Sequence, residues 1–98
     1  MTILVTGATG FIGSRVVINL VKKNLPVVAA DLDLGINKEK LESKYINLGL
    51  NKNLLTFEKL DLNNNNSVEN IFSKYNFDSV INLAYGIGTI CEEKPLLA

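Results

Sequence analysis

Thr-Gly-Ala-Thr-Gly-Phe-Ile-Gly, at positions 6–13, is the most informative part of this 98-residue chain. It follows the short run Ile3–Thr6, whose continuous apolar and β-branched residues are typical of a strand buried on both faces. After the glycines, apolar side chains recur at helical spacing and predict an amphipathic helix over residues 11–23. A glycine string between a strand and a helix is a phosphate-binding arrangement when its context is right.

Each glycine of this string has a predicted role. Gly7 permits the tight turn out of the strand, Gly10 lets the backbone approach a pyrophosphate, and Gly13 lets the helix lie close to the sheet. The free N–H groups and the dipole at the helix start then favour phosphate. A glycine-rich turn that binds nothing is the alternative. A Walker-type phosphate loop is excluded, because no Gly-Lys-Ser/Thr follows.

The rest of the chain alternates strands with helices, which predicts βαβ units and a parallel sheet. The right-handed crossover rule then gives a Rossmann-like, doubly wound α/β fold that is partial, with strand order 3-2-1-4. Asn24 is expected to take a left-handed conformation after the first helix, and Gly49 to stop the second. The further strands are expected at 26–30, 54–60 and 78–84, and the further helices at 38–48 and from a cap at Asn66, paired with Glu69, through Tyr75.

Composition excludes several classes of protein. Ten basic and ten acidic residues give a formal net charge of zero, so no basic field exists to bind nucleic acid or a membrane surface. The absence of histidine excludes Ser-His and Cys-His pairs and His-ligated zinc within the chain, and no metal site is predicted. A single cysteine, Cys91, and the lack of an apolar run of about 20 residues predict a cytoplasmic protein.

The segment at positions 6–13 resembles the N-terminus of the extended short-chain dehydrogenase/reductases, the NAD-dependent epimerases and dehydratases of nucleotide sugars. The resemblance implies NAD as cofactor, with Asp31 binding ribose, Asp61-Leu62 holding adenine, and residues 80–85 lining the path to the nicotinamide. Residues 92–95 also resemble the lead-in to the family's fourth helix. The expected cofactor-binding residues are Gly7, Gly10, Phe11, Ile12, Gly13, Asp31, Asp61, Leu62, Leu83, Ala84 and Tyr85.

Two positions depart from the family pattern. Asn82 stands where histidine is common, and the bulky Tyr85 where a small residue is usual, close to the nicotinamide path. On residue type alone, a turn aspartate explains Asp61 slightly better, and the position after the third strand is what favours the adenine role. Asp31 could likewise merely end a strand. Asp31 lies 18 residues after Gly13, and residues 32–35 contain no cation, which favours NAD over NADP.

No catalytic residue is predicted in this chain. Tyr45, Tyr75 and Tyr85 all lack the lysine four positions later that would lower the pKa of a catalytic tyrosine. We therefore interpret residues 1–98 as the N-terminal NAD-binding segment of a longer enzyme that acts on a nucleotide sugar, truncated before its catalytic and substrate-binding parts. Such a segment is expected to self-associate through its exposed sheet edge. A non-catalytic nucleotide-binding or redox-sensing module, or a non-functional fragment, is the alternative.

Overall fold

A computed structural model describes residues 2–32 and 34–83. The described chain forms four strands and three α-helices, as the sequence predicts, and a short 3-10 turn at Lys52–Leu54. In chain order, the strands and helices are β1 (Ile3–Thr6), α1 (Phe11–Lys22), β2 (Val27–Asp31), α2 (Gly35–Asn47), β3 (Leu55–Lys59), α3 (Asn65–Lys74) and β4 (Ser79–Asn82).

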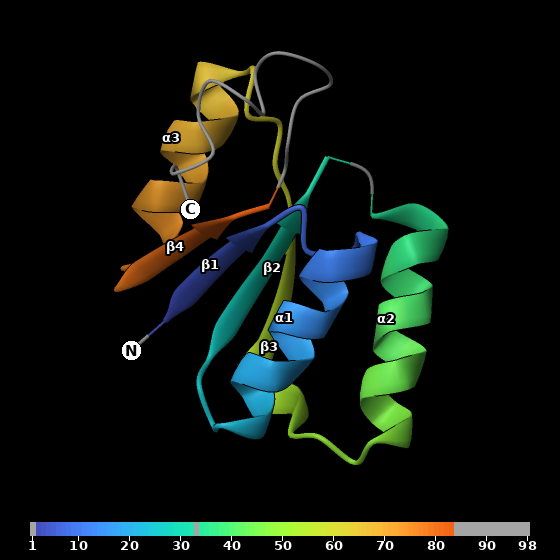
Figure 1. Ribbon diagram of the computed structural model, residues 1–98. Helices are drawn as coiled ribbons and strands as arrows, with labels where there is room; N and C mark the ends of the chain where they lie inside the picture. The colour runs from blue at the N-terminus through green and yellow to red at the C-terminus, as the bar shows by residue number, and fades with distance from the viewer. Residues whose placement is uncertain (1, 33, 84–98) are drawn as a thin grey trace.

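The four strands form one parallel sheet in the order β3-β2-β1-β4, which confirms the predicted topology. Ile3 of β1 lies in register with Val27 of β2 and with Ser79 of β4. The helices lie on both faces of this sheet, α1 and α2 on one and α3 on the other (Figure 1). Because all strands run the same way, their carboxyl ends meet at one edge of the sheet.

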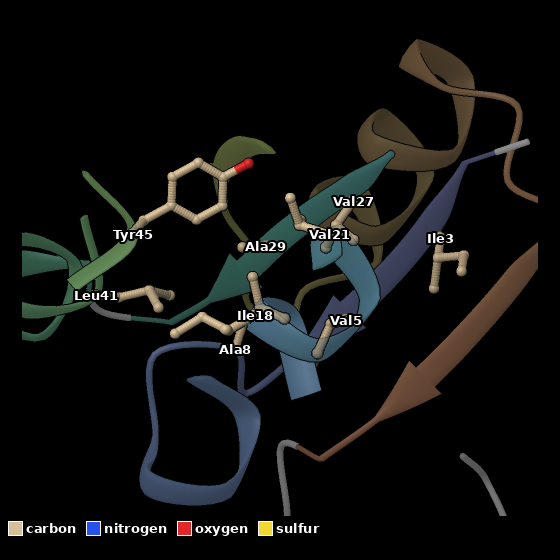
Figure 2. Packing of buried hydrophobic residues seen from close by; sticks show 10 residues of the cluster. Ile3, Val5, Ala8, Ile18, Val21, Val27, Ala29, Leu41 and Tyr45 are labelled. Carbon is tan, nitrogen blue, oxygen red and sulfur yellow. The ribbon is translucent and has the colours of Figure 1, made fainter. Parts of the chain in front are cut away.

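Each face of the sheet buries its own apolar cluster. Ile3 and Val5 of β1 belong to one cluster with Ile18 of α1 and with Leu41 and Tyr45 of α2 (Figure 2). Leu4, between them in sequence, points to the opposite face and belongs to the cluster beneath α3, with Val28, Ala30, Leu60 and Ile71. Successive strand residues face opposite sides, so Ile3, Leu4 and Val5 are all apolar because both sides of β1 are covered.

β4 is shorter than the strand predicted over residues 78–84, and it is only partly buried. It spans four residues, its first residue is exposed, and Val80 and Ile81 are only half-buried. In the part of the chain that the structure describes, β4 pairs with β1 alone. An edge position explains the partial exposure, since the other long side of the strand lacks a described partner.

Two predicted helix ends are confirmed and one is wrong. Asn24 has φ +63°, and Gly49 has φ +69°, so both adopt the left-handed conformation after a helix. α3 is capped by Asn64 rather than Asn66, because the Asn64 side chain accepts a hydrogen bond from the Ser67 N–H at 3.2 Å. α2 also begins earlier than predicted, at Gly35.

Candidate functional site

The candidate site lies along the carboxyl edge of the sheet. Thr6 ends β1 there, Asp31 ends β2, and Asn82 ends β4. The Thr6 hydroxyl donates to Asn82 Oδ1 at 2.5 Å, and the Leu60 N–H donates to the Asp31 carbonyl oxygen at 2.9 Å. These contacts tie neighbouring strand ends together. The Ala8 N–H donates to the Ala30 carbonyl oxygen at 3.1 Å and holds the loop between β1 and α1 beside the end of β2.

The loop over residues 7–10 has the tight geometry that its glycines predict. Gly7 has φ +67°, a conformation that other residues rarely adopt, and its carbonyl oxygen accepts from the Gly10 N–H at 3.2 Å. A Cβ atom at Gly13 would lie 2.0 Å from that same oxygen and 2.9 Å from the Ala8 Cα atom. Gly13 is therefore required for the close approach of α1 to the end of β1.

Three backbone donors at the start of α1 are available to a ligand. The first N–H of this helix to form a hydrogen bond is that of Ser14, which donates to the Gly10 carbonyl oxygen at 2.9 Å. Within residues 2–32 and 34–83, the N–H groups of Phe11, Ile12 and Gly13 donate to no acceptor. Unsatisfied N–H groups at a helix N-terminus, with the positive end of the helix dipole, favour an anion such as a phosphate.

The Asp31 carboxylate faces this loop and is held by it. Asp31 Oδ2 accepts from the Thr9 N–H at 3.1 Å and from the Thr9 hydroxyl at 2.7 Å. Asp31 Oδ1 accepts from the Leu32 N–H at 2.8 Å. Sequence reasoning identified Asp31 but missed Thr9, although the predicted adjacency of the first two strands brings the first loop next to the end of the second strand.

Asp61 and Leu62 follow β3 at the same edge, close to Asp31 through the Leu60 contact. Asp61 Oδ1 accepts from the Asn63 N–H at 2.9 Å, so this residue does form the turn that its residue type suggested. Its other carboxylate oxygen forms no hydrogen bond within the described residues. The Leu62 side chain is 42% exposed and available to a ligand. A structural role for Asp61 thus leaves one carboxylate oxygen for another contact.

A cavity of about 300 Å³ lies between the start of α1 and α2. Thr9, Gly10 and Ser14 line it on one side, and Lys40 and Lys44 on the other. Sequence reasoning did not connect these two lysines with the glycine loop. Their spacing of four residues, which places both on one face of a helix, was the available signal. They give the cavity beside the glycine loop a positive charge.

Neither described tyrosine is suited to act as a base near neutral pH. The Tyr45 hydroxyl donates to the Asn51 carbonyl oxygen, and burial raises the pKa of Tyr45. The Tyr75 hydroxyl donates to Glu58 Oε2 at 2.5 Å, and burial together with that carboxylate raises the pKa of Tyr75 to about 12. A catalytic tyrosine needs its pKa lowered, so both residues are structural in this chain.

Some predicted site residues cannot be placed. The Leu83 N–H donates to the Thr6 carbonyl oxygen at 3.0 Å, which holds Leu83 beside the end of β1. Ala84, Tyr85, Cys91 and residues 92–95 lie outside the described residues.

Over residues 2–32 and 34–83, no group of three or more acidic, cysteine or histidine side chains could hold a metal ion. In that same part, no helix is long and apolar enough to cross a membrane.

Comparison with known proteins finds sequence relatives that are named as 4-epimerases or 4,6-dehydratases of a nucleotide-linked sugar. The sequence model of the GDP-mannose 4,6 dehydratase family matches residues 4–86. UDP-glucose 4-epimerase 2 of Arabidopsis thaliana is 37% identical over 98 residues, which are 98% of this chain and 28% of that protein. The chain therefore spans little more than a quarter of that relative's length.

Two solved structures are similar to this fold. The UDP-glucose 4-epimerase of Thermus thermophilus in complex with NAD has a TM-score of 0.69 at 30% identity, over 99% of this chain and 28% of that one. Gre2 of Candida albicans in complex with NADPH has a TM-score of 0.72 at 27% identity, over 90% of this chain and 25% of that one.

Proposed function

This chain belongs to the extended short-chain dehydrogenase/reductase family, with GDP-mannose 4,6 dehydratase and the UDP-glucose 4-epimerases, and we propose that it binds NAD. The observation that carries the proposal is the pairing of two features at one sheet edge. Three N–H groups at the start of α1 donate to no acceptor among the described residues, and the Asp31 carboxylate lies against the same loop. A phosphate and a ribose hydroxyl are the ligands that these two features favour.

The residues fit the parts of a dinucleotide in order along the edge. The N–H groups of residues 11–13 would hold the pyrophosphate, and Asp31 Oδ1 would accept a ribose hydroxyl. The exposed Leu62 side chain would pack on the adenine. The second Asp61 carboxylate oxygen, which accepts no hydrogen bond among the described residues, would accept one from the adenine amino group. When bound, NAD supplies a nicotinamide ring that can accept a hydride. This chain's residues bind and orient it.

We propose that NAD is preferred over NADP. The Asp31 carboxylate repels a 2′-phosphate, and like charges juxtaposed at an interface cost several kcal/mol. Lys40 and Lys44 oppose this preference, because they line the cavity next to Thr9. Both lysine side chains are solvent-exposed, whereas Asp31 is partly buried, so screening weakens their contribution more than that of the carboxylate.

The parent reaction that we propose is an epimerisation or dehydration of a nucleotide sugar. UDP-glucose 4-epimerase and GDP-mannose 4,6 dehydratase are the kinds of protein that this chain resembles over most of its length. The 98 residues contain no Tyr-x-x-x-Lys pair, so the catalytic groups of such an enzyme would be supplied by further sequence. A transcript that encodes this pair downstream of residue 98 would support the enzyme over a non-catalytic nucleotide-binding module.

Calorimetric titration of the purified chain with NAD and with NADP tests the binding proposal. We expect NAD to bind more tightly, and Asp31→Ala to weaken NAD by about 10- to 100-fold, as for a lost hydrogen bond to a charged group. The same variant should bind NADP relatively better. Glu69→Ala, which removes an exposed carboxylate from α3, is the matched control and should change neither affinity. Absence of NAD binding, or tighter NADP binding, would contradict the proposal.

A further inference from the structure

Ser67, in the first turn of α3, contacts the residue that we propose to bind the adenine amino group. Its hydroxyl oxygen accepts a hydrogen bond from the Asp61 N–H at 3.0 Å, six residues earlier in the chain. On the basis of the proposed dinucleotide binding, we infer that Ser67 is a positioning residue. It holds the backbone of Asp61 so that the carboxylate of that residue meets the adenine. The start of α3 thereby takes part in recognition of the base.

The Asp61 N–H finds no acceptor within the described sheet. The preceding N–H, that of Leu60, donates to the Asp31 carbonyl oxygen at 2.9 Å and so continues the pairing of β3 with β2. β3 is the last strand on its side of the described sheet, so no further strand there accepts from Asp61. A partly buried N–H without an acceptor is costly. Ser67 supplies the acceptor, and the direction in which the chain leaves β3 therefore depends on its hydroxyl.

Two other hydrogen bonds close the turn that follows β3. The Asn63 N–H donates to Asp61 Oδ1 at 2.9 Å, and the Asn64 N–H donates to the Asp61 carbonyl oxygen at 3.1 Å. Both of these bonds lie within the turn itself, whereas the bond to Ser67 joins the turn to the helix. Removal of the Ser67 hydroxyl should therefore release the Asp61 N–H from α3 while the turn stays closed.

The position of Ser67 is itself fixed, because α3 is attached to β3 at its other end. Lys74 Nζ and the Tyr75 hydroxyl both donate to Glu58 Oε2, at 2.7 and 2.5 Å. Between the two ends, Ile71 is buried in the apolar cluster beneath α3. A hydroxyl on a helix held in this way orders the turn before a ligand arrives. Such pre-organisation improves affinity because less freedom is lost on binding.

Helix capping without any effect on the ligand is the alternative role for Ser67. Loss of the hydroxyl would then weaken every dinucleotide equally, because only the stability of α3 would change. A positioning role predicts a loss confined to ligands that carry the adenine amino group. A cavity of about 250 Å³ borders Ser67, with Asn70 and Lys74 also in its lining. Water can therefore reach the Asp61 N–H in Ser67→Ala, and we expect this variant to fold.

Calorimetric titration of this chain with NAD, and with an analogue that carries purine in place of adenine, separates the two roles. The analogue lacks only the amino group. Ser67→Ala is expected to weaken NAD about three- to tenfold and to stay within about twofold of the wild type for the analogue. Ser67→Thr, which keeps the hydroxyl, should stay within about twofold for both ligands. Ser73→Ala is the matched control, because it removes from α3 a hydroxyl that donates to the Glu69 carbonyl oxygen, and it should change neither affinity.

An equal loss for NAD and the analogue, or no loss for either, would overturn the positioning role. A Ser67→Thr variant that loses as much as Ser67→Ala would do the same, since the hydroxyl would then not be the cause. In an Asp61→Ala background, Ser67→Ala should change NAD affinity by no more than about twofold, and a larger loss would contradict the inference.

Two results with the wild type would instead contradict the proposed function. Failure to bind NAD would overturn dinucleotide binding altogether. Equal affinity for NAD and the purine analogue would overturn the adenine role of Asp61 alone. In either case the role inferred for Ser67 would fall with it, whereas the losses compared above test that role in a chain that does discriminate the two ligands.

Discussion

Substitution of Gly13 by alanine tests the closest backbone approach at the site. The added Cβ atom would lie 2.0 Å from the Gly7 carbonyl oxygen, whereas 3.4 Å is the lower limit of ordinary contact. The start of α1 and the end of β1 must therefore separate by about 1.4 Å, the difference between these distances. Both partners are backbone, so no side-chain rotation can relieve the clash.

The expected cost follows from two opposing effects. Overpacking of this kind costs about 1–3 kcal/mol, and we expect the upper end because two backbone segments must move. Alanine in a helix interior gains about 1 kcal/mol over glycine, which offsets part of that cost. The net loss is about 2 kcal/mol, which lowers the Tm of a domain of this size by about 10 °C. NAD affinity should fall as well, because the displaced helix start carries the N–H groups that we propose to bind phosphate.

Thermal unfolding followed by circular dichroism measures the effect, with Gly10→Ala as the matched control. A Cβ atom at Gly10 would lie 3.3 Å from the same Gly7 oxygen, a contact that a small shift relieves. Gly10 is the N-cap of α1, where alanine is less favourable than glycine, so a loss of no more than about 1 kcal/mol is expected. A Gly13→Ala variant that melts at or above the wild-type temperature would refute this reasoning.

Three further predictions concern stability away from the ligand. Gly49→Ala should lose about 1 kcal/mol in urea unfolding through backbone strain alone, because φ is +69° and a Cβ atom there meets nothing within 4 Å; an unchanged midpoint would contradict this. Tyr45→Phe should lose about 1 kcal/mol, because the buried Asn51 contact disappears; unaltered stability would show that water replaces it. Although burial raises the pKa of Glu58, the hydrogen bonds from Lys74 and Tyr75 outweigh it and lower that pKa overall. Glu58→Gln should therefore be less stable than the wild type at pH 7, with the difference disappearing as the pH falls through the lowered folded-state pKa, below the ordinary range near 4.3. A difference that persists at pH 2 would contradict the electrostatic explanation.

The order of the strands could be predicted because it depends on local patterns. β1 and β2 are short, largely apolar runs, and strands alternate with helices along the chain. The handedness of the crossovers then leaves one arrangement. The glycine loop could be predicted for the same reason. Gly7 is required by the turn that it forms, and Gly13 by its close approach to Gly7 and Ala8. Because these residues are near one another in the sequence, the spacing of the glycines is enough to predict the loop.

Features that depend on competition between similar residues could not be predicted. Four asparagines, at positions 63–66, are all able to cap α3, and Asn64 does so because the turn at Asp61 places it one helical turn before Ser67. The burial of β4 depends on which strands and helices lie beside it, and the apolar residues of β4 alone do not indicate those neighbours. Sequence patterns thus identified the elements, while the folded chain selected their ends.

At the candidate site too, the sequence determined some features and the tertiary structure decided others. The sequence alone determined that a glycine loop precedes a helix and that an acid ends the following strand. Only the tertiary structure brings Thr9 to Asp31 across 22 residues and sets Lys40 and Lys44 against the same loop. A side-chain hydrogen bond depends on positions within a few tenths of an ångström, and those positions result from the packing of strands and helices that are distant in sequence.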